Sequence, residues 1–209
     1  MKNATIRFEK NKELVITEKN LIELIDTLSP EDRKTFFRLF LPLLDFTNQT
    51  FKISEELDEQ LRMGCPDICE LKVLADVLWK NTEIIDEYVK ALQEKDKLSV
   101  EDVDLLKSWR HPVSGRFLLE RHHSQGSVFI DTNTSEVYLV KGITDPWSVM
   151  LKQNPLPILM QATLIPFCDC IISDGLVAVE NVSFGFGSRS DFRECYLNAK
   201  QTGRIVTSL

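Results

Sequence analysis

The hydrophobic residues of this 209-residue chain change their spacing near residue 110, and this change limits the possible folds more than any other feature. Before that point apolar residues recur every three or four positions, as on one face of a helix. After it they fall in short runs rich in β-branched and aromatic residues, as in strands. The sequence therefore predicts an α+β protein with a first part at 1–110 and a second at 111–209. It leaves open whether the two parts share one core.

The first part is expected to be a helical bundle. Ser29, followed by Pro30 and two acids, has the residues typical of a helix N-cap and first turn. Ser99 with Asp102 three positions later is a variant of the capping box. Pro42 predicts a kink or an early end. After a short strand within 5–17, the expected helices are 20–28, 30–46, 54–63, 66–80, 82–95 and 99–109.

The second part is expected to be an antiparallel β-meander of about five strands, twisted or half-closed like half a barrel, with a closing helix. The pair Asp174-Gly175 predicts a tight turn in which Gly175 has a positive φ. The other residues expected to shape turns are Pro166, Gly185 and Gly187. The expected strands are 115–123, 126–132, 136–142, 155–167 and 168–185, with helices at 146–153 and 188–201.

Several blocks in the second part resemble a segment of uncharacterised bacterial proteins, some of them associated with SEC-C metal-binding motifs. The blocks are Trp109 with Gly115-Arg116-Phe117, then 137–146, 163–176, 183–187 and 196–200, with 40–48 as a further match in the first part. The resemblance covers nearly half of the chain. It implies no activity, and the SEC-C cysteine cluster itself is absent from this sequence.

Cysteine and histidine residues supply the ligand types of a zinc site. These are Cys168, Cys170, His122 and His123, with Cys65 and Cys69 in the first part. The simpler interpretation is free thiols, because free cysteine is among the most buried residue types. Cys69 is expected to face the bundle beside Leu71 and Leu74. We expect no metal and no cofactor.

Two acids and one arginine are the candidates for catalysis. Asp174 near Asp145, or alternatively near Asp169, would give a paired acid/base site, and Arg189 after Gly185 would help a helix N-terminus to bind phosphate. No GxGxxG or GK[ST] pattern accompanies them, and no nucleophile motif surrounds any cysteine. We therefore interpret these residues first as parts of turns. The alternative is that they belong to a hydrolase-like or nucleotide-handling enzyme.

Composition narrows the function classes further. A formal net charge of −7 disfavours nucleic acid as a partner, because phosphate binding needs clustered Lys and Arg. No apolar run reaches the ~18 residues of a membrane span, and no secretory signal is recognised. Five cysteines fit a reducing compartment. We expect a cytoplasmic, non-enzymatic protein-interaction or regulatory module, with a groove lined by Phe167, Phe184, Phe186 and Trp147.

Overall fold

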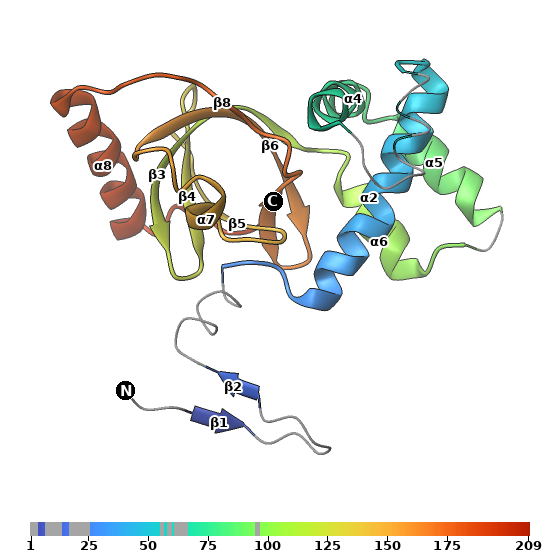
Figure 1. The fold of residues 1–209 in the computed structure, drawn as a ribbon, viewed down its shortest axis with the longest axis horizontal. Coiled ribbons are helices and arrows are strands. Elements are labelled where there is room, and N and C mark those ends of the chain that lie inside the picture. The colour runs from blue at the N-terminus through green and yellow to red at the C-terminus, as the bar shows by residue number, and fades with distance from the viewer. Residues whose placement is uncertain are drawn as a thin grey trace.

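In the computed structural model of the chain, residues 26–54, 57, 60, 67–94 and 97–209 are described, together with the backbone of two short strands near the N-terminus (Figure 1). The helices are α2 (Pro30–Phe51), α4 (Ile68–Lys80), α5 (Ile84–Gln93), α6 (Val100–Ser108), α7 (Trp147–Met150) and α8 (Phe186–Gln201). The strands are β1 (Ala4–Ile6), β2 (Leu14–Ile16), β3 (Val113–His123), β4 (Gly126–Asp131), β5 (Val137–Lys141), β6 (Ile158–Phe167), β7 (Cys170–Ser173), β8 (Ala178–Val179) and β9 (Ile205–Val206). The chain is thus a mixed α+β protein. None of the helices in the described residues is long and apolar enough to cross a membrane.

The helix starts follow from local capping chemistry. The Ser29 hydroxyl accepts the Asp32 N–H at 3.1 Å, and Ser99 and Asp102 form the capping box that their spacing predicts. The prediction for Pro42 is wrong as far as the end of the helix is concerned, because α2 continues to Phe51. Pro42 lies on the exposed side of α2, where water can bond the carbonyl that loses its intrahelical partner.

Two predicted helices fall largely on residues that the structure does not describe. Of the segment 20–28, residues 26–28 are described and are not helical, because Thr27 forms a β-bridge with Gly142. Of the segment 54–63, Leu57 and Gln60 are described and are helical. Cys65 and Pro66 lie outside the described residues.

The strands of the second part close into a ring, and the predicted meander is wrong in its strand order. The order is β3-β4-β5-β7-β6, and β6 pairs back to β3 along seven residue pairs. All neighbours in the ring are antiparallel except β5 and β7, which are parallel. The result is a five-stranded barrel of Greek-key order with one parallel pair, an arrangement that resembles OB-type barrels. Hydrophobic spacing predicted the strands but carries no information on which distant strands pair.

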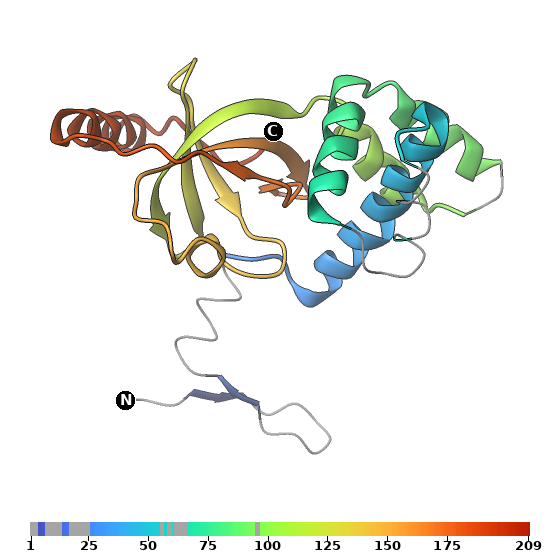
Figure 2. The same ribbon diagram turned by 45° about the horizontal axis from the view of Figure 1, so that its top comes forward.

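Three apolar clusters hold the molecule together. The barrel is filled by side chains such as Phe117, Phe129 and Met160. On one outer side, α8 covers β3, β4 and β5 by placing Tyr196 and Ala199 on apolar side chains of those strands. On another side the helices α2, α4, α5 and α6 lie against the barrel (Figures 1 and 2).

The helices do not form a separate bundle around a core of their own. Their core cluster also contains Ile143, Ile165, Phe167 and Ile172 from the second part of the chain. The cause is that the helices and the outer sides of β6 and β7 each present apolar side chains, which are removed from water by packing on one another. The core therefore crosses residue 110.

Candidate functional site

A tryptophan and a carboxylate form the central polar contact between the helices and the barrel. Trp79, in the last turn of α4, donates its indole N–H to Oδ2 of Asp174 at 2.7 Å. The other carboxylate oxygen accepts the Leu176 N–H at 3.0 Å and the Ser173 hydroxyl at 3.3 Å. The Asp174 N–H donates to the Thr163 carbonyl at 3.2 Å. Asp174 is therefore held on all sides by partners within the protein.

Burial controls the protonation of this carboxylate. Asp174 is 4% exposed, and the loss of hydration raises the pKa of its carboxyl from 3.8 to about 6, against the opposing effects of the Trp79 and Leu176 hydrogen bonds and of Lys72. A raised carboxyl pKa is common among catalytic acids. Here both oxygens are hydrogen-bonded and almost no surface is open to a substrate, so the geometry is that of a structural link.

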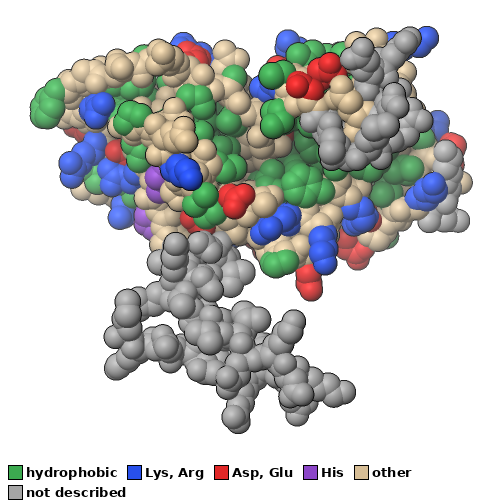
Figure 3. Space-filling view, viewed as in Figure 1, with side chains coloured by type: hydrophobic (Ala, Val, Ile, Leu, Met, Phe, Trp, Pro, Cys, Tyr) green, Lys and Arg blue, Asp and Glu red, His purple; other side chains and the backbone are tan. Residues whose placement is uncertain are grey.

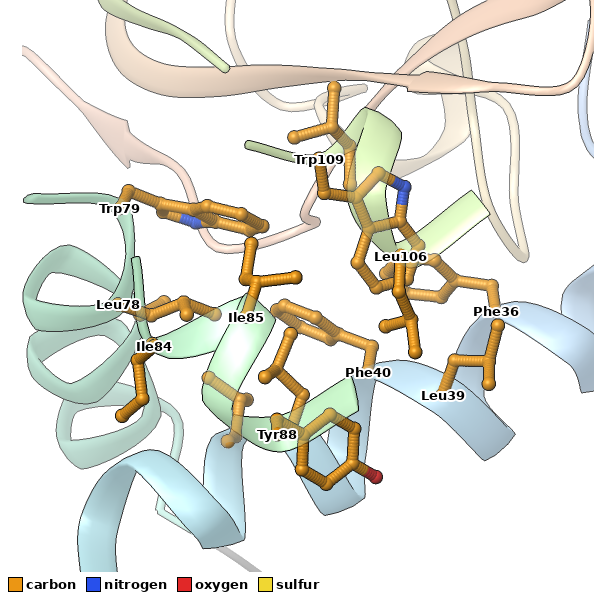
Figure 4. Close-up of a cluster of buried hydrophobic side chains, with 14 of the residues drawn as sticks. Phe36, Leu39, Phe40, Leu78, Trp79, Ile84, Ile85, Tyr88, Leu106 and Trp109 are labelled. Atoms are coloured by element: carbon orange, nitrogen blue, oxygen red, sulfur yellow. The ribbon is translucent and has the colours of Figure 1, made fainter. Parts of the chain in front are cut away.

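A second indole makes a similar link from the end of α6. Trp109 is fully buried and donates its indole N–H to the Pro166 carbonyl at 2.9 Å. Figure 4 shows Phe36 and Phe40 of α2 in the same cluster as the two tryptophans; Phe40 stacks on Trp79 with ring centres 6.0 Å apart. The two indoles thus fix the helices to β6 and to the segment after β7.

Beside the first link lies a cavity of about 350 Å³, which we call the junction cavity. It lies between α4 and the strands β3 and β6, and Figure 3 shows the surface hollowed between the helical part and the barrel. Its volume is within the range of small-ligand sites. Its lining consists of Lys72, Asp76, Trp79, Lys80, Ser114, Gly115, Arg116, Asn133, Gln161, Ala162 and Thr163.

The lining of the junction cavity is polar and locally basic. Three cations and one acid give a formal charge of +2, which Glu180, bound to Arg116 by two hydrogen bonds of 2.8 and 2.7 Å, reduces to +1. Lys72 forms an ion pair with Asp76 one turn further along α4, and in the described residues Lys80 has no acidic partner. Ser114 and Thr163 share a hydrogen bond of 2.9 Å between their hydroxyl groups. This lining can bind an anionic, hydrogen-bonding group, but it contains no arranged nucleophile and base.

The predicted catalytic residues lie on separate parts of the molecule. Asp174 is buried beside α4, whereas Asp145 is exposed in the segment between β5 and α7. Arg189 is exposed in α8, on the other side of the barrel from the helices (Figure 1), and its Nε donates to the Phe184 carbonyl at 3.0 Å. The three side chains therefore do not form one catalytic centre.

The predicted metal ligands are not gathered either. In the described part of the chain, no three His, Cys, Asp or Glu side chains are grouped so that they could hold a metal ion. Cys168 lies at the tip of the β6–β7 hairpin, and burial raises its pKa and that of Cys170, the latter to about 11, which disfavours thiolates. His122 bonds the Ser127 hydroxyl at 2.8 Å, and burial lowers its pKa; His123 is exposed.

Cys69 departs from the prediction that it faces the helical core. It is exposed in the first turn of α4, whereas Leu71 and Leu74 are buried. The helix is rotated so that the buried stripe is the one that continues to Leu78. A cysteine in the first turn can be assigned to a face only when the phase of the whole helix is known.

The four predicted groove residues do not line one groove. Phe167 is buried against the helices, and Trp147 is buried at the barrel interior. Phe184 packs edge-on to Phe192 of α8, and Phe186, at the start of α8, is 91% exposed. No shared surface connects them.

The predicted turn residues also differ in their positions. Gly175 has φ +82°, the left-handed conformation that glycine favours. Pro166 is in β6 and not in a turn; the β3–β6 ladder ends at Leu164, so its missing N–H breaks no bond to β3. Gly185 precedes α8, and Gly187 is inside that helix, so neither position requires a glycine conformation.

Comparisons with known proteins do not extend these observations. No family model matches the chain, and neither the curated proteins nor the solved structures contain a significant match.

Sequence reasoning missed the residues of the junction cavity. They come from α4, β3, β6 and the β4–β5 turn, and none forms a recognised motif. The one local signal is the repeat of Lys72, Asp76 and Lys80 on one face of a helix at four-residue spacing. That spacing is equally typical of a solvated helix surface.

Proposed function

We propose that this protein is a cytoplasmic, non-enzymatic interaction module that binds an acidic segment of a partner protein at the junction cavity. The observation that carries the proposal is the contrast between the two kinds of polar residue at the junction. Asp174, whose carboxyl pKa is raised by burial, is closed off and hydrogen-bonded at both oxygens. The groups that remain open are three cations, hydroxyls and amides, together with one acid, Asp76, which is paired with Lys72; these groups can bind anionic and main-chain groups but include no arranged nucleophile and base.

Charge supports an acidic partner. The chain as a whole carries −7, whereas the junction cavity is locally positive, so an acidic segment is repelled by most of the surface and attracted at this site. Lys80 lies at the rim with its ammonium group unpaired among the described residues, and the Lys72–Asp76 pair is a surface pair worth ~0.3–0.5 kcal/mol, which a ligand can displace. The four described cysteines are free thiols, as expected of a cytoplasmic protein.

Two other functions have less support. OB-type barrels bind oligonucleotides on the face of their second and third strands. Here these strands are β4 and β5, and α8 and β9 cover them. An enzyme would need Asp145, Asp174 and Arg189 to converge, and they lie apart. We also propose that the second part of the chain is related to the uncharacterised bacterial proteins that it resembles; this relationship implies no activity.

The proposal is tested by affinity capture from native cell extract with three baits: the wild-type protein, Lys80→Glu and, as a matched charge reversal elsewhere, Lys152→Glu. Both lysines are exposed, so both variants should fold, which circular dichroism checks. We expect a protein with an acidic segment to be captured by the wild type and Lys152→Glu and lost with Lys80→Glu. Equal capture by all three baits would contradict binding at this cavity.

A further inference from the structure

A second cavity lies under the C-terminal part of the chain, on the other side of the β4–β5 turn whose Asn133 lines the junction cavity. Its volume is about 530 Å³, and we call it the C-terminal cavity. It lies between the β4–β5 turn, α8 and β9 and opens to solvent, since most of its lining residues are exposed. Its lining consists of Thr134, Ser135, Glu136, Val137, Cys195, Asn198, Ala199, Arg204 and Val206.

The end of α8 positions one arginine in this cavity. Gly203, with φ +65°, reverses the chain after the helix, and the Arg204 N–H then donates to the Ala199 carbonyl at 2.9 Å. The chain continues into β9, which pairs in parallel with β5 through Val137 and Tyr138. The reversal thus fixes the backbone of Arg204 beside the barrel wall.

The guanidinium of Arg204 has spare hydrogen-bonding capacity. Its Nε donates to the Thr202 hydroxyl at 2.8 Å, and in the described part of the chain no carboxylate lies within 4.0 Å of it. The acid in the lining, Glu136, accepts the Tyr138 hydroxyl at 2.7 Å instead. Arg204 is exposed and lines the cavity, and among the described residues its two terminal nitrogens have no hydrogen-bond partner, so they can bind a planar carboxylate through two parallel hydrogen bonds.

The other lining residues determine which chemical groups the ligand can carry besides its carboxylate. Val137 and Ala199 are buried and Val206 of β9 packs against the barrel core, so these residues make one side of the cavity apolar but leave only a small apolar surface open. Asn198 and Ser135 give the rim a few polar groups. Glu136 lies in the same lining as Arg204, so the formal charges of the empty site cancel. A bound carboxylate would give the site a net charge of −1, whereas a doubly charged phosphate would give it −2 and is therefore disfavoured.

We propose that the C-terminal cavity binds a small monocarboxylate with an apolar body, with Arg204 holding the carboxylate and the Val137–Ala199–Val206 wall holding the apolar part. The site is separate from the junction cavity, and it does not depend on the function proposed there. It joins α8 and β9 to the barrel, so a bound carboxylate also adds contacts between these elements.

Octanoate is a suitable probe, with octanamide as the uncharged analogue of the same length. Titration of the full-length protein is followed by NMR at the backbone amides of Val137, Asn198 and Val206. We expect saturable shifts at these residues in the wild type and in Arg193→Gln, which removes an exposed arginine of α8 outside the cavity. We expect Arg204→Gln, and octanamide with the wild type, to bind at least about tenfold more weakly, because one charge-assisted pair of hydrogen bonds is lost.

Two results would overturn the proposal. The first is the absence of saturable shifts at these amides up to about 10 mM octanoate, a concentration that detects even very weak binding. The second is equal binding of octanoate and octanamide, or of octanoate by the wild type and Arg204→Gln, since either shows that the arginine does not recognise the carboxylate. Unchanged thermal unfolding of Arg204→Gln in the absence of probe separates loss of binding from loss of fold.

Discussion

Asp174 should make the stability of this protein fall as the pH rises from about 4 to about 7. Its carboxyl has a pKa of about 6 in the folded protein, against 3.8 when unperturbed, because burial disfavours the charged form. Between these two values the folded state keeps a proton that the unfolded state has released. The stabilising contribution is therefore complete below 3.8 and is lost as the pH rises through 6.

The size of the effect follows from the two pKa values. At ~1.36 kcal/mol per pH unit, the difference corresponds to about 3 kcal/mol over the whole range. About 2 kcal/mol of this change in the free energy of unfolding falls between pH 4.5 and pH 7.5, a range in which other carboxylates contribute less to the pH dependence. Asp174→Asn removes the titration, although an amide can satisfy only one of the two sets of donors that the carboxylate accepts from Trp79 and Leu176.

The assay is urea-induced unfolding at several pH values for the wild type, Asp174→Asn and Asp145→Asn. Asp145 is an exposed acid of the same part of the chain and provides the matched control. We expect the free energy of unfolding of the wild type, relative to Asp174→Asn, to fall by about 2 kcal/mol from pH 4.5 to pH 7.5. The change measured with Asp145→Asn gives the baseline for removing one exposed negative charge and is subtracted. Parallel curves for the wild type and Asp174→Asn would refute the burial of this carboxyl beneath α4.

Three further perturbations test the backbone, the second indole link and the thiols. Gly175→Val should lower stability by about 1–3 kcal/mol because it forces a β-branched residue to φ +82°. Gly187→Ala, in the first turn of α8, should raise it by less than the ~0.5–1 kcal/mol of a mid-helix glycine. Thermal unfolding that does not separate the two variants would reject the turn assignment. Trp109→Phe should cost about 2–4 kcal/mol, since a fully buried indole loses its hydrogen bond and leaves a cavity, and a loss below about 0.5 kcal/mol in urea unfolding would contradict this. At pH 8, Cys170, with its pKa raised to about 11, should react with iodoacetamide about tenfold or more slower than the exposed Cys69, as measured by peptide mass spectrometry; equal rates would argue against its burial.

The elements that the sequence predicts well are those whose causes are local. Ser29 and Ser99 cap helices because their hydroxyls bond N–H groups three residues away, and such spacing is visible in the sequence. Gly175 follows an acid at a turn, and its positive φ is again a property of neighbouring residues. Pro42 misleads because the effect of a proline depends on which side of the helix faces water.

The features that the sequence does not predict depend on contacts between distant residues. The parallel pairing of β5 with β7 joins strands separated by α7 and β6, and no periodicity in either strand specifies a partner. Trp79 and Asp174 are 95 positions apart. Each has a simpler local interpretation, a core residue of α4 and a turn residue, and only the fold shows that they bond to each other.

The residues of the candidate site cannot be predicted from the sequence for the same reason. Lys72 and Lys80 are placed on one face of α4 by their spacing, but Arg116 and Thr163 come to that face only because the ring of strands closes between β3 and β6. The predicted site residues are acids, thiols, imidazoles and aromatic residues, whose chemistry is familiar but whose positions in the sequence do not show that they lie together. The cavity is formed by residues of ordinary types that the topology brings together.

Amide hydrogen exchange of the protein alone and in complex with the captured partner tests most directly whether the junction cavity is the binding site. Binding at the junction cavity should slow exchange in the second half of α4, at residues 114–116 of β3 and at residues 161–163 of β6, with no protection when the partner is mixed with Lys80→Glu. Protection confined to other surfaces, such as α7 or the exposed side of α2, and retained in Lys80→Glu, would contradict it.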